Sequence, residues 1–222
     1  MEIDINGNTF ILLPQKAIYW KQEKTLLIGD LHLGKVMHFR KEGIAVPSAA
    51  AETNFARLDE LLAGSPTERI IFLGDLFHNQ YNSEWERFTK WRSENPSVEM
   101  IIVPGNHDIL PDHLFTKNKI DIRKKEFTTG NFLFTHHPKE IIPASVHSFC
   151  GHVHPVIRIY SRGRQSLKLP CFVMEEQQTI LPSFGVFTGG YCMDTKSGRS
   201  IYGIANDNIF KVGQREMNQV DY

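Results

Sequence analysis

Long apolar runs are missing from this 222-residue sequence, and cysteine is scarce. No stretch approaches the roughly 18 apolar residues that a membrane-spanning helix needs, and the first residues lack the basic segment of a secretion signal. We therefore expect no membrane association and a cytoplasmic location. The three cysteines, Cys150, Cys171 and Cys192, are an odd number without metal-type spacing, so we expect reduced, mostly buried thiols.

An excess of charge of either sign is also absent, because 25 Lys and Arg residues balance 25 Asp and Glu residues. The molecule as a whole therefore has no field that would attract nucleic acid or an anionic membrane, and any surface for a polyanion must be local. We find no internal repeat, low-complexity tract or interdomain linker. Since 222 residues are enough for one large domain with a full core, we expect residues 1–222 to fold as a single domain.

Histidine is well represented, and several of the ten histidines follow short apolar runs bounded by glycine or proline. Such runs predict buried strands whose polar ends emerge at one edge of a sheet. In open α/β sheets, that carboxyl edge is where ligands bind. Five runs end in this way: 26–28 before Asp30 and His32, 70–73 before Asp75 and His78, 100–103 before Asn106, His107 and Asp108, 132–134 before His136 and His137, and 146–150 before His152 and His154.

The remaining patterns predict an α/β protein in which two β-sheets pack together with helices outside. Caps and helical spacing predict helices over residues 48–63 and 83–92 and a short helix within 108–117. After residue 154 the sequence changes to short strands and turns. Further strands are predicted at 2–5, 9–13, 17–20, 120–122, 156–160, 169–174, 184–188, 200–204 and 209–212.

Two other stretches have a bearing on function. Trp85, Phe88 and Trp91 could stack on nucleobases, but their near-helical spacing favours packing into the core. The irregular segment 34–47 follows the first Asp-x-His motif and is long for a loop inside a compact domain, and such loops commonly serve function. It contains Lys35 and Arg40.

In order over residues 30–154, the motifs are D-x-H, G-D-x-x-H, G-N-H-D, H-H-P and G-H-x-H. A single aspartate at a strand end is more often a turn former, and a single buried histidine is usually only hydrogen-bonded. The five motifs together resemble the calcineurin-like metallophosphoesterase superfamily. The resemblance implies a two-sheet β-sandwich flanked by helices (α-β-β-α), with a dinuclear metal site at the carboxyl ends of the strands.

The resemblance also implies a role for each motif residue. Asp30, His32 and His154 would bind one divalent ion, Asn106, His136 and His152 would bind the other, and Asp75 would bridge the two. His107 would lie beside the scissile phosphate. Asp108 would lie one layer farther from the metals, behind the residues that contact them. A hydroxide that bridges the two metals would attack the phosphorus.

The chemistry of these side chains supports two divalent ions. Imidazole and carboxylate together suit manganese, our first candidate, or iron, zinc or nickel, whereas an all-oxygen set would suit magnesium or calcium. Two ions carry about +4, and Asp30 and Asp75 return only two negative charges, so the centre stays positive toward an anionic phosphate. Two metals about 3.5–4 Å apart can lower the pKa of a shared water and clamp the phosphate.

Shorter motifs narrow the resemblance. Residues 30–35 (D-L-H-L-G-K), Phe39-Arg40, 43–47 (G-I-A-V-P) and 181–185 (L-P-S-F-G) resemble a bacterial family of ligase-associated DNA-damage-response endonucleases or phosphodiesterases, the PdeM type. That family implies manganese-dependent hydrolysis of phosphodiester bonds in DNA during repair, with a DNA ligase and a helicase as candidate partners. Whether the protein is a monomer or a dimer stays open.

For each of three further sets of residues, the sequence allows two interpretations. His78 resembles the histidine that helps to handle the phosphodiester in break-repair nucleases of the superfamily, or it only orients His107. Lys35 and Arg40 either bind a substrate phosphate or form surface salt bridges. The basic cluster near the last motif either follows a nucleic-acid backbone or is simply solvated; it consists of Arg158, Arg162, Arg164 and Lys168.

Two other functions compete with a phosphodiesterase that acts on DNA. One is a phosphomonoesterase or pyrophosphatase acting on a small nucleotide-like metabolite, which the zero net charge allows. The other is a non-catalytic scaffold that keeps the metallophosphoesterase fold, and it predicts missing ligands or a missing catalytic histidine. All seven proposed metal ligands and His107 are in the sequence, so the scaffold ranks last.

Overall fold

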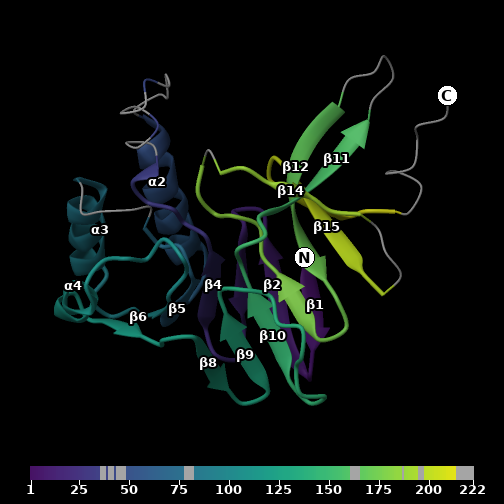
Figure 1. Ribbon diagram of the computed structural model, residues 1–222, viewed down its shortest axis with the longest axis horizontal. Helices are drawn as coiled ribbons and strands as arrows, with labels where there is room; N and C mark the ends of the chain where they lie inside the picture. Colours follow the sequence, from purple (N-terminus) through teal and green to yellow (C-terminus); the bar gives the residue numbers. More distant parts are fainter. Residues whose placement is uncertain are drawn as a thin grey trace.

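Two β-sheets packed face to face form the centre of the computed structural model (Figure 1). The structure describes residues 1–35, 39, 43, 49–77, 83–160, 166–186, 188–194 and 198–213. His78, Arg40, Arg162, Arg164 and most of segment 34–47 lie outside these ranges. The expectations for those residues therefore stay predictions.

The first sheet arranges its strands in sequence order, and β4, β5 and β6 are parallel to one another. The strands before them pair in antiparallel fashion. The members of this sheet are β1 (Glu2–Ile5), β2 (Asn8–Leu13), β3 (Ala17–Trp20), β4 (Thr25–Gly29), β5 (Arg69–Leu73), β6 (Glu99–Val103) and β7 (Ile120–Ile122).

The second sheet is mixed. In it, β10 pairs in parallel with β9 and β13, and the later strands pair mainly in antiparallel fashion. We call the hairpin of β11 and β12 the arm, because it extends beyond the rest of the second sheet (Figure 1). The strands of this sheet are β8 (Glu126–Thr129), β9 (Phe132–Thr135), β10 (His147–Cys150), β11 (Pro155–Tyr160), β12 (Ser166–Met174), β13 (Gln178–Ile180), β14 (Tyr191–Cys192), β15 (Ser200–Ala205) and β16 (Asn208–Lys211).

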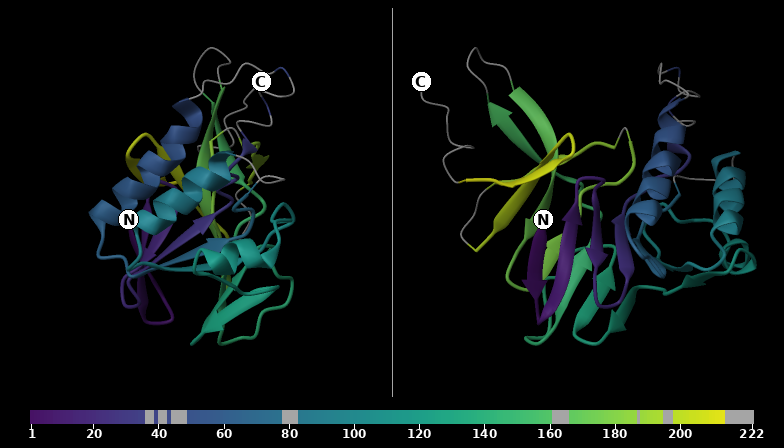
Figure 2. Two further views of the ribbon diagram at one scale, coloured as in Figure 1. Left: turned by 90° about the vertical axis from the view of Figure 1, so that its left-hand side faces the viewer. Right: turned by 180° about the vertical axis from the view of Figure 1, so that it is seen from behind.

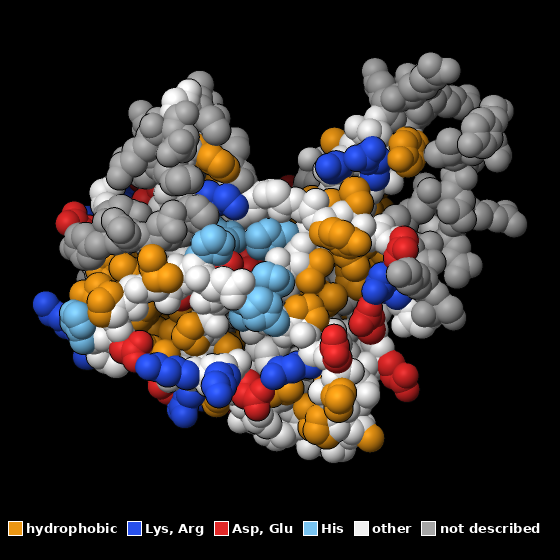
Figure 3. All heavy atoms as spheres, in the orientation of Figure 1, with side chains coloured by type: hydrophobic (Ala, Val, Ile, Leu, Met, Phe, Trp, Pro, Cys, Tyr) orange, Lys and Arg blue, Asp and Glu red, His pale blue; other side chains and the backbone are white. Residues whose placement is uncertain are grey.

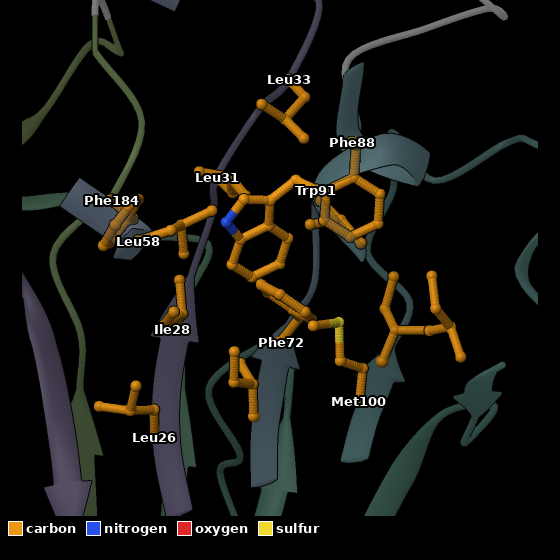
Figure 4. Close-up of a cluster of buried hydrophobic side chains, with 14 of the residues drawn as sticks. Leu26, Ile28, Leu31, Leu33, Leu58, Phe72, Phe88, Trp91, Met100 and Phe184 are labelled. Carbon is orange, nitrogen blue, oxygen red and sulfur yellow. The ribbon is translucent and has the colours of Figure 1, made fainter. Parts of the chain in front are cut away.

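The helices in the described ranges, α2 (Ala49–Gly64), α3 (Ser83–Glu94) and α4 (Asp112–Lys117), cover the outer face of the first sheet (Figure 2). They pack on alternate residues of the parallel strands, such as Ile28 and Ile102. Figure 4 shows Trp91 of α3 lying among Phe72 and Phe88. Burying each such side chain stabilises the fold by about 1.5–3 kcal/mol.

The intervening residues of the same strands face the second sheet. Leu27, Ile71 and Ile101 pack with Phe134 and Phe149 in a second core between the sheets. This alternation is the two-residue period of strands that are buried on both faces. A shift by one residue would move every side chain to the other core, so packing fixes where each strand ends.

The predicted two-sheet sandwich is confirmed, and so are the five strands that precede the motifs. Trp85, Phe88 and Trp91 are buried in the core beneath α3, which confirms that they pack rather than stack on bases. The cysteines are free thiols, two of them buried and Cys192 exposed. No described helix has the length and apolar character needed to cross a membrane.

The strand predicted at residues 184–188 is wrong, because the described residues of this range, 184–186 and 188, form no strand. The backbone N–H of Phe184 donates to the carbonyl oxygen of Gly29 at 2.9 Å, and that of Gly185 donates to Asp30 at 3.1 Å. The segment therefore crosses the end of β4 instead of pairing along a strand, and the Phe184 ring is buried in the core beneath α2. The prediction also omitted three short strands, β8, β13 and β14.

Candidate metal centre

The strand register brings the polar ends of both sheets to one edge. Gly29 of β4 lies beside Leu73 of β5, which lies beside Val103 of β6. In the second sheet, Cys150 of β10 lies beside Thr135 of β9. The residues that follow these positions meet, and Figure 3 shows histidine side chains gathered at the centre of one face with acidic atoms between them.

A first group joins Asp30, His32 and His154. The Nε2 atoms of the two histidines are 3.3 Å apart, and Nε2 of His154 lies 3.3 Å from Oδ1 of Asp30. The potential ligand atoms all lie within 4.8 Å of one another. The structure thus brings together the three residues expected to bind the first ion.

A second group consists of His136, His137 and His152. Nδ1 of His152 lies 3.1 Å from Nε2 of His136. Asn106, expected to bind the same ion, is exposed, and its Oδ1 lies 2.9 Å from Nε2 of His137. His137 was missed as a site residue, because the resemblance gives a role only to the first histidine of the H-H-P motif.

Asp75 lies between the two groups. Its Oδ2 atom is 3.8 Å from Nε2 of His32 in the first group and 3.7 Å from Nε2 of His136 in the second. Asp75 also forms a potential ligand set with Asp30 and His136. This position between the groups is the one that a bridging ligand needs.

The donor set fits divalent cations. Oδ1 of Asp30 is buried and has no hydrogen-bond partner among the described residues. Two imidazole nitrogens lie near it, that of His154 at 3.3 Å and that of His136 at 3.8 Å. A buried carboxylate oxygen without a hydrogen bond is unfavourable unless a positive charge compensates it, and a cation held with these imidazoles would supply that charge.

The backbone at the site is unusual. Five of the seven expected ligands have left-handed φ angles between 46° and 67°. Each non-glycine residue in this conformation costs of order 1–3 kcal/mol and persists only where the surrounding structure enforces it, commonly at functional sites. The residues are Asp30, His32, Asp75, His152 and His154.

Glycines that precede expected ligands leave room for the side chains of other expected ligands. A Cβ atom on Gly74 would lie 2.0 Å from Nδ1 of His136, and one on Gly151 would lie 2.4 Å from Oδ2 of Asp30. Real Cβ atoms essentially never approach so closely. The glycines in these motifs are therefore required by the close approach of the second sheet to the first.

Backbone carbonyls orient the imidazoles. Nδ1 of His136 lies 3.2 Å from the carbonyl oxygen of Leu73, and Nδ1 of His154 lies 3.2 Å from that of Gly189. Donation from Nδ1 to a carbonyl leaves Nε2 as the ligand atom facing the centre. Burial and the neighbouring histidines lower the pKa of His152, which favours the neutral form that binds metals.

His107 lies at the same centre. Its backbone N–H donates to Oδ1 of Asp75 at 2.9 Å, so one aspartate oxygen is hydrogen-bonded while the other faces the histidines. The His107 ring is 5.6 Å from the ring of His32. The side chain is half-buried and can reach a substrate at the rim.

Asp108 supports the loop that contains His107. Its carboxylate accepts hydrogen bonds from the backbone N–H groups of Phe77 and Gly105, both at 2.9 Å. These bonds tie the loop after β6 to the segment after β5. Desolvation of the carboxylate raises the pKa of Asp108 to about 6.

The expected phosphate-binding residues are described only in part. Lys35 is half-buried, and desolvation lowers its pKa, although Asp75 and Asp30 act on the pKa in the opposite direction. Arg40 and His78 lie outside the described ranges.

The segment after β13 is a further part of the centre. Oγ of Ser183 donates to the carbonyl oxygen of Asp30 at 2.9 Å, and the N–H of Gly185 donates to the same oxygen. The carbonyl group of this expected ligand is therefore held by a segment about 150 residues later in the chain. The motif at 181–185 marked this segment as part of the family resemblance, but it did not indicate the hydrogen bonds to Asp30.

Comparisons with known proteins agree with this geometry. Residues 23–171 match the family model of calcineurin-like phosphoesterases. The crystal structure of Pseudomonas putida nuclease MPE is similar, with 32% sequence identity, a TM-score of 0.79, and coverage of 96% of this chain and 99% of that one. The structure of a conserved uncharacterised protein from Streptococcus pneumoniae aligns over 86% of this chain and 90% of that one at 11% identity. Its TM-score of 0.32 is too low to support an inference.

A search of curated proteins gives no match. The family model nevertheless spans well over half of the chain, and the nuclease structure covers nearly all of it. The resemblance seen in the sequence motifs is thereby confirmed. The chain belongs to the calcineurin-like phosphoesterase family and is a metal-dependent phosphoester hydrolase.

Proposed function

We propose that this protein is a phosphodiesterase that cleaves DNA with two divalent ions, manganese being the first candidate. The observation that carries the proposal is that two groups of potential ligands lie side by side with Asp75 between them. Two adjacent ions can activate a shared water and stabilise the charge that develops on a phosphate. One ion alone would not need a carboxylate in contact with both groups.

The proposed ligand sets follow the groups. Asp30, His32 and His154 hold one ion, His136, His152 and Asn106 hold the other, and Asp75 bridges them. His137 orients Asn106, because its Nε2 lies 2.9 Å from the amide oxygen of that residue. A neutral amide in place of a third carboxylate keeps the centre positive toward phosphate.

His107 donates a proton or a hydrogen bond to the leaving oxygen. Asp108 holds the loop that presents His107, and Lys35 adds a positive charge for a phosphate oxygen. His78 and Arg40 complete the proposed contacts with substrate.

The choice of a nucleic acid is supported by the nuclease from P. putida, which is 32% identical over almost the full length, and the choice of DNA by the resemblance of the motifs at 30–35 and 181–185 to the PdeM-type family. We further propose that the protein works in DNA repair in the cytoplasm, with a DNA ligase and a helicase as partners, and that residues 1–222 act as one domain. A phosphomonoesterase acting on a small nucleotide is the second candidate, since the chain has no net charge.

A substrate panel tests the proposal. The purified protein is supplied with manganese and offered bis-p-nitrophenyl phosphate, p-nitrophenyl phosphate, and single- and double-stranded DNA. Turnover of the diester and of DNA without comparable turnover of the monoester is expected. Monoester turnover alone would support the second candidate, and metal binding without any turnover would support a scaffold.

A further inference from the structure

Arg57 of α2 holds the segment after β13 through a single residue, Phe184. Its Nη1 atom donates to the carbonyl oxygen of Phe184 at 2.6 Å, and its guanidinium carbon lies 5.1 Å from the centre of the Phe184 ring. A cation within about 6 Å of an aromatic ring is attracted to the ring face. Phe184 is fully buried, and Figure 4 shows it beside Leu58, the next residue of α2. Arg57 therefore binds both the backbone and the side chain of Phe184.

The segment held in this way is the one that contacts the backbone of Asp30. Oγ of Ser183 and the N–H of Gly185 both donate to the carbonyl oxygen of Asp30, at 2.9 and 3.1 Å. A Cβ atom on Gly185 would lie 2.4 Å from the carbonyl oxygen of Leu31, so the segment lies directly against the chain at this point. Because Phe184 lies between the two donors, a displacement of Phe184 would shift both of them.

The backbone of Asp30 in turn sets the place of its carboxylate. Asp30 has a left-handed φ of 52°, and such a conformation persists only where the surrounding structure enforces it. Its Oδ2 atom accepts a hydrogen bond from the backbone N–H of His152 at 2.8 Å, while Oδ1 lies near the imidazoles of His136 and His154. A rotation of the chain at Asp30 would move both oxygens, so the hydrogen bonds to its carbonyl oxygen help to fix the expected ligand.

The charge of Arg57 is not balanced by an ion pair. Arg57 is half-buried, and no acid in the described ranges forms an ion pair with it. Desolvation lowers the pKa of Arg57, and Glu60 acts on it in the opposite direction. Desolvation and the charge of Arg57 together lower the pKa of the half-buried Lys16 to about 8. Two neighbouring cations removed from water are unfavourable, so charge balance within the fold does not explain an arginine at this position.

We propose that Arg57 is a positioning residue of the metal centre. By holding Phe184, it keeps the two neighbouring donors on the carbonyl oxygen of Asp30, and the Asp30 carboxylate stays in place for the ion that it binds. The inference rests on the proposed function, which assigns Asp30 to that ion. Partners that orient a metal ligand from outside typically change metal affinity or activity by about 10–100-fold when they are replaced.

Arg87 of α3 provides a matched control. Its guanidinium carbon lies 4.9 Å from the centre of the Phe55 ring, and the side chain also pairs with Glu52. Phe55 and Phe184 belong to the same core cluster. R87A therefore removes the same type of side chain and the same kind of ring contact as R57A, but it leaves the segment on Asp30 untouched.

Manganese binding tests the effect on the ligand. Isothermal titration calorimetry of the metal-free wild type should show two sites. In R57A one site should weaken by about tenfold or more and the other far less, whereas R87A should match the wild type. R57K keeps a cation that can donate to the same carbonyl oxygen and should restore most of the affinity. The manganese concentration that gives half-maximal hydrolysis of bis-p-nitrophenyl phosphate should shift in the same way.

Hydrogen exchange measured by NMR in EDTA tests the positioning without metal. The backbone N–H of Gly185 reports the contact with the carbonyl oxygen of Asp30. That of His152 donates to Oδ2 of Asp30 and reports the position of the carboxylate. Because these contacts open locally, exchange at both should be at least about tenfold faster in R57A than in the wild type, and it should be unchanged in R87A.

Three results would overturn the inference. One is an equal change in R57A and R87A, because loss of packing alone would then explain both. Another is a wild type that binds two ions with an R57A variant of the same affinity. The third is exchange in R57A that accelerates as much at Glu99, at the amino end of β6, as at His152, which would mean general loosening of the fold. If the wild type binds no manganese, the proposed function fails, and faster exchange at His152 in R57A alone would still establish that Arg57 positions Asp30.

Discussion

The partners of the carboxylate side chains differ between the two ends of β4, β5 and β6. At the amino ends, Arg69 contacts Glu99 at 2.6 Å and Glu23 at 3.6 Å, and all three side chains are at least partly exposed. At the carboxyl ends, Asp30 and Asp75 are buried, and the groups around them are imidazoles. Among the residues that the structure describes, the carboxylates at the amino ends form ion pairs with arginine, whereas Asp30 and Asp75 have ion pairs only with histidines.

Within the same strands, the side chains at the amino ends are compatible with a stable fold alone, whereas those at the carboxyl ends are suited to binding cations. Exposed ion pairs such as those at the amino ends contribute about 0–1 kcal/mol each. Buried carboxylates without a full cationic partner are unfavourable for folding. The left-handed backbone at five of the expected ligands adds to that unfavourable balance. An edge that is locally unstable in this way needs bound cations, which the amino ends do not.

The largest effect is expected for Asp75→Asn. The substitution keeps the shape of the side chain but removes the charge from the position between the two groups. We expect hydrolysis of bis-p-nitrophenyl phosphate to fall at least about 1,000-fold, or about 4 kcal/mol in activation free energy, and bound manganese to fall below two ions per chain by elemental analysis. Glu99→Gln, at the opposite end, should change neither quantity.

His107→Ala should separate catalysis from metal binding. The ring lies near His32 but belongs to neither ligand group, so we expect two bound ions and a kcat lowered by about 100-fold or more, the usual contribution of proton transfer by a side chain. Steady-state kinetics and metal content are measured on the same preparation. Loss of the metals together with activity would show that His107 is a ligand.

A histidine at the amino end of β10 provides a test by pH. Burial lowers the pKa of His147 to about 4, and its Nε2 contacts Oγ1 of Thr179 at 2.8 Å. Because the unfolded chain binds the proton more readily, this histidine's contribution to stability is complete above pH 6.5 and is lost as pH falls toward 4, by up to about 3 kcal/mol. Urea unfolding in EDTA should show this loss, and His147→Gln should show less of it.

The smallest effect is expected from replacing a glycine that has a positive φ with alanine, and two such glycines can be compared. Gly74, at +76°, faces His136, and Gly130, at +54°, faces open space at the opposite end of β9. Alanine at either position should destabilise the fold by about 1–2 kcal/mol. Only Gly74→Ala should also lower activity, by at least about tenfold, because its Cβ displaces the His136 ring. Equal activities in the two variants would mean that the clash is relieved without moving the ligand.

Much of this arrangement could be predicted from sequence. The five apolar runs are strands because each is short and bounded by glycine or proline, and parallel strands place their ends together. The expected convergence of Asp30, Asp75 and His136 follows from that geometry. Trp91 could be assigned to the core because helical spacing is a local pattern.

Contacts between distant segments could not be predicted. Residues 184–188 have the apolar character of a strand, but the backbone N–H groups of Phe184 and Gly185 donate to Gly29 and Asp30, and local sequence does not specify such partners. The role of His137 depends on the position of Asn106 in another sheet. The left-handed backbone of Asp30 and His32 has no sequence signal, because neither is glycine.

The central claim is that the carboxyl edge holds two cations between its own carboxylates and imidazoles. Anomalous diffraction from crystals soaked in manganese tests it most directly. We expect two peaks, one among Asp30, His32 and His154 and the other beside His136 and His152, with Asp75 in contact with both. A map without peaks at this edge, or with one ion that Asp75 does not touch, would contradict it.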